Sequence, residues 1–438
     1  MFIRATESIT KSDGSYLALH QYHHSRMPFF FKLFLFYLLP VIVSAYMLQI
    51  LRQWRTRQAP PFNASTFLER IDISSQTRKI HLVVLVHGWM GNSLEMDYLK
   101  DSLQRQARYN ENQSETFLIH AAVCNEGQTS DGIAAGGSRL AKETNEIVKH
   151  LWQKYTDAEV TLSLVGNSLG GLYSRFALSE IAWDAKEQRQ KLIPRLFVTT
   201  ATPHLGVSQH TYIRLPRSVE YPIAKVMQQT GKDLFRFSSV IDDMTFQPNF
   251  LAPLQQFEQR IAYINVYGTD FQVPTPTAAF WAETDSLHEL VSEESEPAPS
   301  NVIMRLKTAS SPQEELLFHP KSTENSQSTI SYMTQRLDGL GWIKVLIDVR
   351  DHMPSLYTGR RSVPVNARSA KETWTARELL STFGGMQQGR LTLAPLGHTV
   401  MIANSKDAFN RWVTKGGKPI MDHLATTMVQ TLSDTNNE

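Results

Sequence analysis

A serine between glycines gives this chain its clearest chemical signal. Residues 166–170 read Gly-Asn-Ser-Leu-Gly and match G-x-S-x-G, a pattern that holds a nucleophilic serine on a sharp turn. The turn needs a strand before it and a helix after it, and "EVTLSLVGN" followed by "LGGLYSRFALSEIAW" supplies both. Gly166 and Gly170 are expected to permit the tight packing. Ser168 is therefore a predicted nucleophile, and the competing interpretation is a glycine-rich turn with a bystander serine.

An upstream turn could stabilise the negative charge that such a nucleophile creates. The run "VLVHGWMGN" ends an apolar strand at His87 and Gly88. An acyl-transfer site of this type takes one oxyanion donor from the residue after the nucleophile and another from a loop after an early strand. The predicted donors are the N–H groups of Leu169 and Trp89, with Met90 as the alternative to Trp89. His87 is expected to shape the loop rather than to carry a proton.

A serine nucleophile also needs a base, and the base needs an acid that orients it. With this type of turn the chain order is serine, then acid, then histidine. Asp270 is the predicted acid because it stands at the end of the strand-like run "RIAYINVYGTD". Three other acids downstream of Ser168 remain alternatives: Asp348, Asp351 and Asp285.

The base is expected on a loop downstream of the acid. His398 follows a glycine in "LAPLGHTVMIAN" and is the predicted base. His352, directly after a strand, and His423, inside a predicted terminal helix, remain alternatives. His204 precedes Asp270, which is the wrong order for this role.

The elements around these residues alternate between strands and helices from about residue 78 onward. This alternation of strands and helices predicts an α/β fold with a mostly parallel sheet and helices on both faces. Two polar stretches, near 284–328 and 355–388, are interpreted as surface insertions, because they are rich in Ser, Pro and acidic residues. The segment 207–237 is a candidate cap over a pocket for an apolar group.

The N-terminal part has a different composition. A tail at 1–28 precedes a hydrophobic segment at 29–51, and a basic linker follows at 52–77. About 20 apolar residues span a bilayer core, so 29–51 is a predicted membrane anchor, single-pass or monotopic. A cleaved signal peptide, a hydrophobic hairpin and a buried core helix are the alternatives. Basic residues flank both ends and give no orientation.

Bulk composition excludes several classes of function. The net charge of +2 and the lack of an arginine–aromatic module argue against a nucleic-acid partner. With Cys124 as the single cysteine there is no disulfide framework, which favours a catalytic domain that faces a reducing compartment. No Cys/His spacing suggests a zinc site. We therefore expect neither a metal nor a cofactor.

Several motifs together resemble a known family. "VLVHGWMGNSLEMDYL", "LVGNSLGGLYSRFAL", "TTATPHLGV", "NVYGTDFQVPTPTAAF" and "GHTVMIAN" occur in order. They are similar to the serine esterase family of lipase-like α/β-hydrolases, which includes fungal phospholipases and lipid-droplet lipases. The resemblance covers about 80–280 and patches of 330–430. It implies Ser168 as nucleophile, Asp270 as acid and His398 as base in a hydrolase domain spanning 78–435.

One position departs from the family pattern. The family usually has Gly-His-Ser-Leu-Gly, whereas Asn167 stands before the serine here. The resemblance implies a serine hydrolase that cleaves carboxylic esters of lipids or other apolar molecules, and the hydrophobic segment at 29–51 predicts that this hydrolase is membrane-associated. An acyltransferase or thioesterase with the same triad remains an alternative, and so does a non-catalytic membrane adaptor that retains the fold.

Overall fold

The computed structural model describes residues 62–433, apart from a set of short gaps. These gaps are 70, 72, 75, 111–113, 186–189, 209–214, 267–269, 271–272, 292–298, 300, 312–325, 353–371 and 384–396. The predicted tail at 1–28, the hydrophobic segment at 29–51 and the first part of the linker lie outside the described residues. Within the described part of the chain, no helix is both long and apolar enough to cross a membrane.

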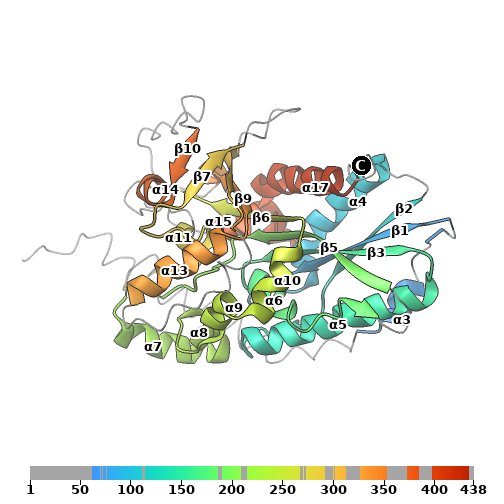
Figure 1. The fold of residues 1–438 in the computed structure, drawn as a ribbon, viewed down its shortest axis with the longest axis horizontal. Helices are drawn as coiled ribbons and strands as arrows, with labels where there is room; N and C mark the ends of the chain where they lie inside the picture. The colour runs from blue at the N-terminus through green and yellow to red at the C-terminus, as the bar shows by residue number, and fades with distance from the viewer. Residues whose placement is uncertain are drawn as a thin grey trace, which may run out of the picture. The chain divides into compact units, whose positions relative to one another are not determined.

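One large sheet runs through the domain (Figure 1). Its strand order is β10-β7-β8-β9-β6-β5-β3-β1-β2, and β4 pairs with β5 at the side. Neighbours from β2 to β9 are parallel, whereas β8, β7 and β10 are added antiparallel. The strands are β1 (Lys79–Val86), β2 (Glu115–Ala121), β3 (Glu159–Asn167), β4 (Asp184–Ala185), β5 (Gln190–Thr200), β6 (Gln259–Asn265), β7 (Leu287–Leu290), β8 (Val302–Thr308), β9 (Trp342–Ile347) and β10 (Thr373–Thr375).

The central strands are buried on both faces. In β1 every residue from Ile80 to Val86 is buried, and in β3 every residue from Val160 to Asn167. Continuous apolar runs of this kind are typical of parallel strands covered by helices on either side. These runs give the sheet its core and hold the strand ends in register.

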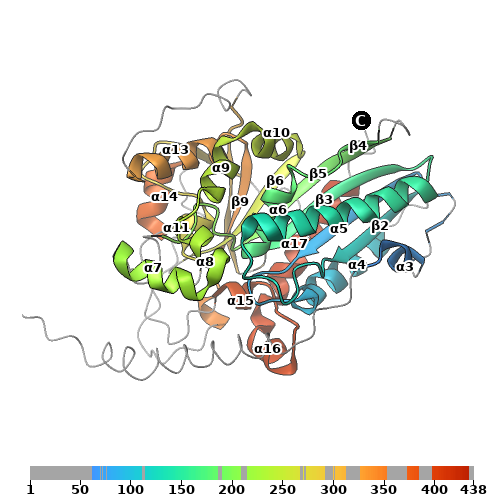
Figure 2. The same cartoon turned by 90° about the horizontal axis from the view of Figure 1, so that it is seen from below.

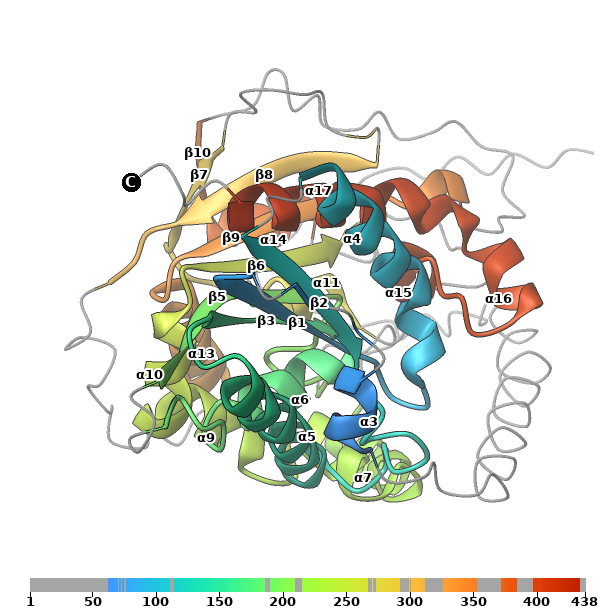
Figure 3. The ribbon, with the colours of Figure 1, turned by 90° about the vertical axis from the view of Figure 1, so that its right-hand side faces the viewer.

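Helices cover both faces of the sheet, as Figure 3 shows. On one face α4 (Asp97–Asn110) packs against α17 (Lys418–Ser433). On the other face lie α3 (Ala64–Glu69), α5 (Ile133–Lys154), α6 (Leu169–Ala177), α9 (Val240–Phe246) and α10 (Pro248–Gln256). The predicted mostly parallel sheet with helices on both faces is confirmed.

Shorter elements complete the described part of the chain. The helices are α7 (Arg217–Val226), α8 (Gln228–Leu234), α11 (Thr275–Ala278), α13 (Ser326–Asp338), α14 (Ala376–Phe383), α15 (Gly397–Met401) and α16 (Ala408–Val413). The 3₁₀ turns are η2 (Ser93–Met96), η3 (Arg350–His352) and η5 (Lys415–Gly417). The predicted cap segment therefore carries α7 and α8.

The two predicted polar insertions contain ordered elements that the sequence did not reveal. The stretch 284–328 contributes β7 and β8 to the main sheet, and 355–388 contributes β10 and α14. The strand β9 is consequently an interior strand, between β6 and β8. The alternating burial of β8 was not recognised in the sequence because polar, Ser- and Pro-rich residues surround this short strand.

The predicted linker at 52–77 also contains structure. Helix α3 buries Ala64 and Leu68 and packs on α5. The folded domain therefore begins before residue 78, since these apolar side chains belong to the main core.

Candidate functional site

Ser168 occupies the sharp turn between β3 and α6. Its backbone has φ 52° and ψ −120°, a conformation that non-glycine residues adopt rarely. A residue held this way costs about 1–3 kcal/mol and persists only where its surroundings enforce it. The Ser168 N–H donates to the carbonyl of Thr200 on β5, at 2.8 Å. The side chain is half-buried at the carboxyl end of the parallel strands.

One glycine before the serine and one after it make this turn possible. A Cβ on Gly166 would lie 2.4 Å from the backbone of Gly171, and one on Gly170 would lie 2.2 Å from the carbonyl oxygen of Val86. Both distances are far below van der Waals contact, so any side chain there would push α6 away from the strands. Gly88 lies against the turn as well, since a Cβ there would come 3.1 Å from that of Ser168.

Asp270 and His398 form a buried pair across 128 positions of the chain. The Nδ1 atom of His398 lies 3.2 Å from Oδ1 of Asp270, and both residues are buried. The same carboxylate oxygen accepts the N–H of Val273 at 3.0 Å. His398 stands in α15 rather than on the predicted loop, as the second residue of that short helix.

Burial and charge act in opposite directions on His398. Burial alone would lower the pKa of the ring, but the charge of Asp270, its hydrogen bond and the charge of Glu95 together raise the pKa above 6.5. Because the pKa is raised on folding, the stability that this pair contributes is present below pH 6.5. That stability is lost as the pH rises through the raised pKa.

The contact between base and nucleophile is not formed in this structure. The outward nitrogen of His398, Nε2, lies 3.4 Å from the hydroxyl of Thr399, and no hydrogen bond between the described atoms joins the ring to Ser168. Such contacts are often long without substrate and tighten when it binds. The structure thus joins two of the three predicted triad residues directly and places the third at the nearby strand ends.

The glycine-rich loop after β1 lies beside the serine turn, because Val86 of β1 is in register with Gly166 of β3. The Met90 N–H donates to the hydroxyl of Thr129 at 3.0 Å, so this donor already has an acceptor. Leu169 is the first residue of α6, where the N–H has no partner within the helix. His87 is buried with Nδ1 at 3.0 Å from the Gly88 carbonyl, which suits the predicted loop-shaping role.

Glu95 links this loop to the segment that carries the histidine. Its buried carboxylate accepts the N–H of Gly88 at 3.2 Å and the side-chain amide of Asn404 at 3.3 Å. Lys406 adds a second link through the carbonyl of Met90, at 3.2 Å. Glu95 and Asn404 lie inside two of the motifs quoted above, but no role was predicted for them because nothing in the sequence indicates that they contact each other.

The alternative acids have other roles. Asp348 forms a two-pronged ion pair with Arg350, with N–O distances of 2.7–3.1 Å. Asp285 is largely exposed and lies 3.5 Å from Arg377. The side chain of Asp351 lies outside the described residues.

The alternative bases lie elsewhere too. His423 pairs with the hydroxyl of Tyr263 at 2.8 Å. His352 is exposed and packs on Gly416. His204 is fully buried, with Nε2 at 3.1 Å from the Thr199 hydroxyl.

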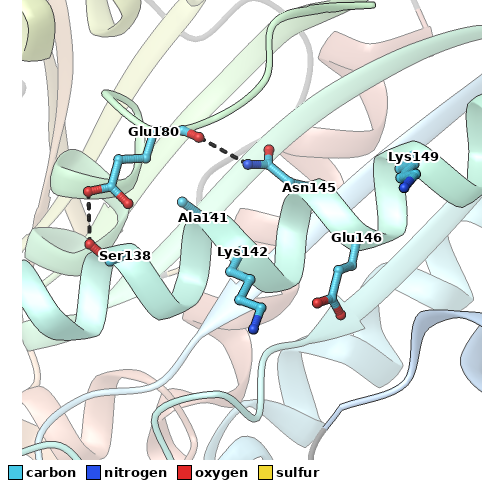
Figure 4. Close-up of a pocket in the computed structure, with 7 residues that line it drawn as sticks. All are labelled: Ser138, Ala141, Lys142, Asn145, Glu146, Lys149 and Glu180. Carbon is cyan, nitrogen blue, oxygen red and sulfur yellow. Dashed lines mark hydrogen bonds between the residues drawn. The ribbon is translucent and has the colours of Figure 1, made fainter.

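An open hollow lies on the described surface away from this site. Figure 4 shows an open depression of about 300 Å³ along α5, where the Ser138 hydroxyl and the Asn145 amide bind Glu180. It contains no nucleophile–base pair, so we assign it no chemistry. Among the described residues, no group of three or more His, Cys, Asp or Glu side chains could hold a metal ion.

The chain is similar to one described family and to several fungal proteins. Residues 76–280 match the family described as "Putative serine esterase (DUF676)". A Saccharomyces cerevisiae protein named "Putative lipase YDL109C" is 30% identical over 203 residues, which cover 44% of this chain and 29% of that protein. A Schizosaccharomyces pombe protein named "Putative lipase C4A8.10" is 29% identical over 260 residues, covering 56% and 31%. The chain thus spans less than a third of the length of these two relatives.

Solved structures show only a distant likeness. "Phospholipase PlaB from Legionella pneumophila" has a TM-score of 0.29 at 14% identity, covering 49% of this chain and 48% of that chain. The sheet and the serine turn between β3 and α6 nevertheless fit the α/β-hydrolase fold.

Proposed function

Because residues 76–280 belong to the serine esterase family, we propose that this chain hydrolyses carboxylic esters through Ser168, His398 and Asp270. The observation that carries the proposal is the buried Asp270–His398 pair at 3.2 Å, on the same edge of the sheet as the strained Ser168. A serine at its free pKa is a weak nucleophile, and a base oriented by an acid is the arrangement that activates it.

The first half of the reaction forms an acyl-enzyme. Ser168 Oγ bonds to the ester carbonyl carbon while His398 Nε2 takes the hydroxyl proton. Asp270 accepts the Nδ1–H and stabilises the imidazolium. The tetrahedral intermediate then collapses, the bond to the alcohol oxygen breaks, and His398 returns the proton to that leaving alcohol. For this step Nε2 turns from Thr399 toward Ser168.

The second half regenerates the serine. Water attacks the acyl carbon, His398 takes one of its protons, and the carboxylic acid leaves as the proton returns to Ser168 Oγ. In both halves the negative oxygen requires donors. We assign these to the Leu169 N–H, at the start of α6, and to the Trp89 N–H in the loop after β1. Met90 is the weaker candidate because its N–H is bonded to Thr129.

We propose apolar acyl esters of lipids as the substrate class. The yeast relatives named putative lipases support this, and so does the apolar segment at 29–51, which would hold the enzyme where such esters partition. With Cys124 as the only cysteine, we place the catalytic domain in a reducing compartment. Neither a metal nor a cofactor takes part in these steps.

A fluorophosphonate probe tests the proposed nucleophile and base. The full chain, purified in detergent, should label rapidly, whereas Ser168→Ala should not label and His398→Ala should label at least about 10³-fold more slowly. His352→Ala and His423→Ala are matched controls that should retain wild-type labelling. A folded wild type that never labels would refute the hydrolase and favour a non-catalytic adaptor.

The products distinguish hydrolysis from the alternatives with the same triad. Lipid esters incubated with the wild type should release free fatty acid. If the acyl group appeared instead on an added alcohol, or only thioesters were cleaved, the triad would stand and the acceptor or substrate class would be wrong.

A further inference from the structure

Helix α16 presents two large aromatic side chains to solvent. Phe409 is 70% exposed and Trp412 is 69% exposed, and their ring centroids lie 6.4 Å apart. No residue of this helix is buried. Paired exposed aromatic rings are unusual on a free surface, because burying such side chains is strongly favourable. The pair therefore indicates a contact surface.

Polar contacts hold this helix in place without a core of its own. Asp407 caps it by accepting the Asn410 N–H at 2.8 Å, and it also accepts the side-chain amide of Asn410 at 2.7 Å. At the other end the Thr414 hydroxyl donates to the carbonyls of Asn410 and Asn404. The aromatic pair is thus held outward by a fixed support.

Basic residues flank the aromatic pair along the chain. Between residues 404 and 418 the acid Asp407 serves as the cap, while four residues are basic. Arg411, Lys415 and Lys418 are exposed, whereas Lys406 is half-buried. On the adjoining helix α17, Asp422 is already paired with Arg105 at 3.2 Å. Aromatic rings among exposed cations match the interface of an anionic bilayer, where rings lie at headgroup level and cations meet phosphate.

The surface is continuous with the proposed catalytic site. Asn404 and Lys406, just before α16, hold Glu95 and the carbonyl of Met90 in the loop after β1. His398 lies on α15, and Figures 2 and 3 both show α16 next to α15 at the edge of the described ribbon. A bilayer that contacts α16 would consequently lie close to the serine turn.

We propose that Phe409 and Trp412, with Arg411, Lys415 and Lys418, dock the catalytic domain onto an anionic lipid bilayer. This rests on the proposed function, because it describes how the site reaches esters within a membrane. A second copy of the chain fits this surface less well. A two-fold contact would place the same basic residues against each other.

The single cysteine allows a direct test in the full chain. In a Cys124→Ala background, Phe409→Cys gives one labelling position for an environment-sensitive nitrobenzoxadiazole dye. The protein is placed in phosphatidylcholine vesicles with or without phosphatidylserine, and quenching by spin-labelled lipid is measured. Tyr109→Cys, at an 86% exposed position of α4, is the matched control.

The expected result is a blue shift and loss of emission at position 409 in vesicles with phosphatidylserine, with neither at position 109. Arg411→Glu together with Lys415→Glu should reverse most of the quenching. Equal exposure of positions 409 and 109 to water would overturn the proposal. A blue shift that depended on protein concentration without lipid quenching would also overturn it, in favour of a second copy. Ser168→Ala should quench like the wild type, so a failure of the hydrolase is seen separately.

Discussion

Two histidines in this protein are buried to nearly the same degree, and each pairs with a buried carboxylate. His398 is 7% exposed and lies 3.2 Å from Asp270, whereas His120 is 4% exposed and lies 2.5 Å from Glu143. Burial and pairing therefore do not distinguish them. The difference is in what else surrounds each pair.

The His120 pair is enclosed by structural contacts. Glu143, on α5, also accepts the N–H groups of Val123 and Cys124, at 3.0 and 2.7 Å. The rings of Phe62 and Phe67 pack on His120 with centroids 4.8 and 4.7 Å away. This pair joins α3, β2 and α5, and the thiol beside it, that of Cys124, is hydrogen-bonded to Glu143. Burial also raises the pKa of the Cys124 thiol, which keeps that group protonated and inert.

The outward nitrogen of His398 makes only a long contact with the Thr399 hydroxyl, at 3.4 Å, and a strained serine lies on the same edge of the sheet. A histidine–carboxylate pair thus acts as a base only if its second nitrogen can reach a nucleophile. Loss of the carboxylate should therefore lower the reaction rate in the His398 pair. In the His120 pair it should lower the free energy of unfolding instead.

Asp270→Asn should produce the largest effect. The amide cannot hold the Nδ1–H tautomer or stabilise the imidazolium, and the corresponding change in a serine triad lowers the rate about 10⁴-fold. The fluorophosphonate labelling rate measures this, and the midpoint of urea unfolding measures stability. Labelling within tenfold of wild type would show that Asp270 does not orient the base.

Glu143→Gln should affect stability rather than rate. Its amide would place a donor against one of three buried partners, so the free energy of unfolding should fall by about 3 kcal/mol. The shift in the urea midpoint at constant slope measures this loss. The labelling rate of the folded fraction should stay at the wild-type value.

Glu146→Gln is the matched control for that variant. It changes the same residue type one turn away on the rim of the open hollow in Figure 4, where the expected loss is below about 0.5 kcal/mol. If Glu143→Gln slowed labelling as strongly as Asp270→Asn, the two pairs would not be functionally distinct.

Glu95→Gln should change the pH dependence of labelling. The rate requires neutral His398, so it falls as the pH drops through the raised pKa of the ring. Asp270 contributes most to that increase and Glu95 contributes less. Removing the charge of Glu95 lowers the pKa, so the acidic limb of the profile should move to lower pH.

A second carboxylate in the same region controls for this effect. Glu126 accepts the Ser93 N–H at 2.8 Å, next to the loop after β1. Glu126→Gln should leave the acidic limb in place. An unchanged limb in Glu95→Gln would mean that its charge does not act on His398.

The local part of the site could be predicted from sequence. The serine turn is specified within a dozen residues by a strand, two glycines and a helix, so its position followed directly. The pairing of Asp270 with His398 depends on how β6 and α15 meet, and could be proposed only from chain order and family resemblance. Glu95 was missed because its contact with Asn404 joins segments 309 positions apart, which the sequence alone does not bring together.

Strand β8 is a part of the fold that could not be predicted from the sequence. In β8, Met304, Leu306 and Thr308 are buried with exposed or half-buried residues between them, a strand period of two. That signal is only seven residues long, and polar Ser- and Pro-rich stretches flank it on both sides. Composition therefore favoured a surface insertion, whereas pairing with β9 places the strand in the sheet.

Thr399→Val should have the smallest effect, and it tests the availability of the outward nitrogen. At 3.4 Å the hydroxyl of Thr399 is a weak partner for His398 Nε2, near the limit of a hydrogen bond. A partner this weak competes little with Ser168, so its removal should change the labelling rate by less than about threefold, which corresponds to roughly 0.7 kcal/mol. A tenfold increase would mean that Thr399 holds the ring away from the serine, as Glu143 holds His120. A tenfold decrease would mean that the hydroxyl positions the ring for catalysis. In either case the contrast between the two pairs would depend on Thr399 as well as on the carboxylates.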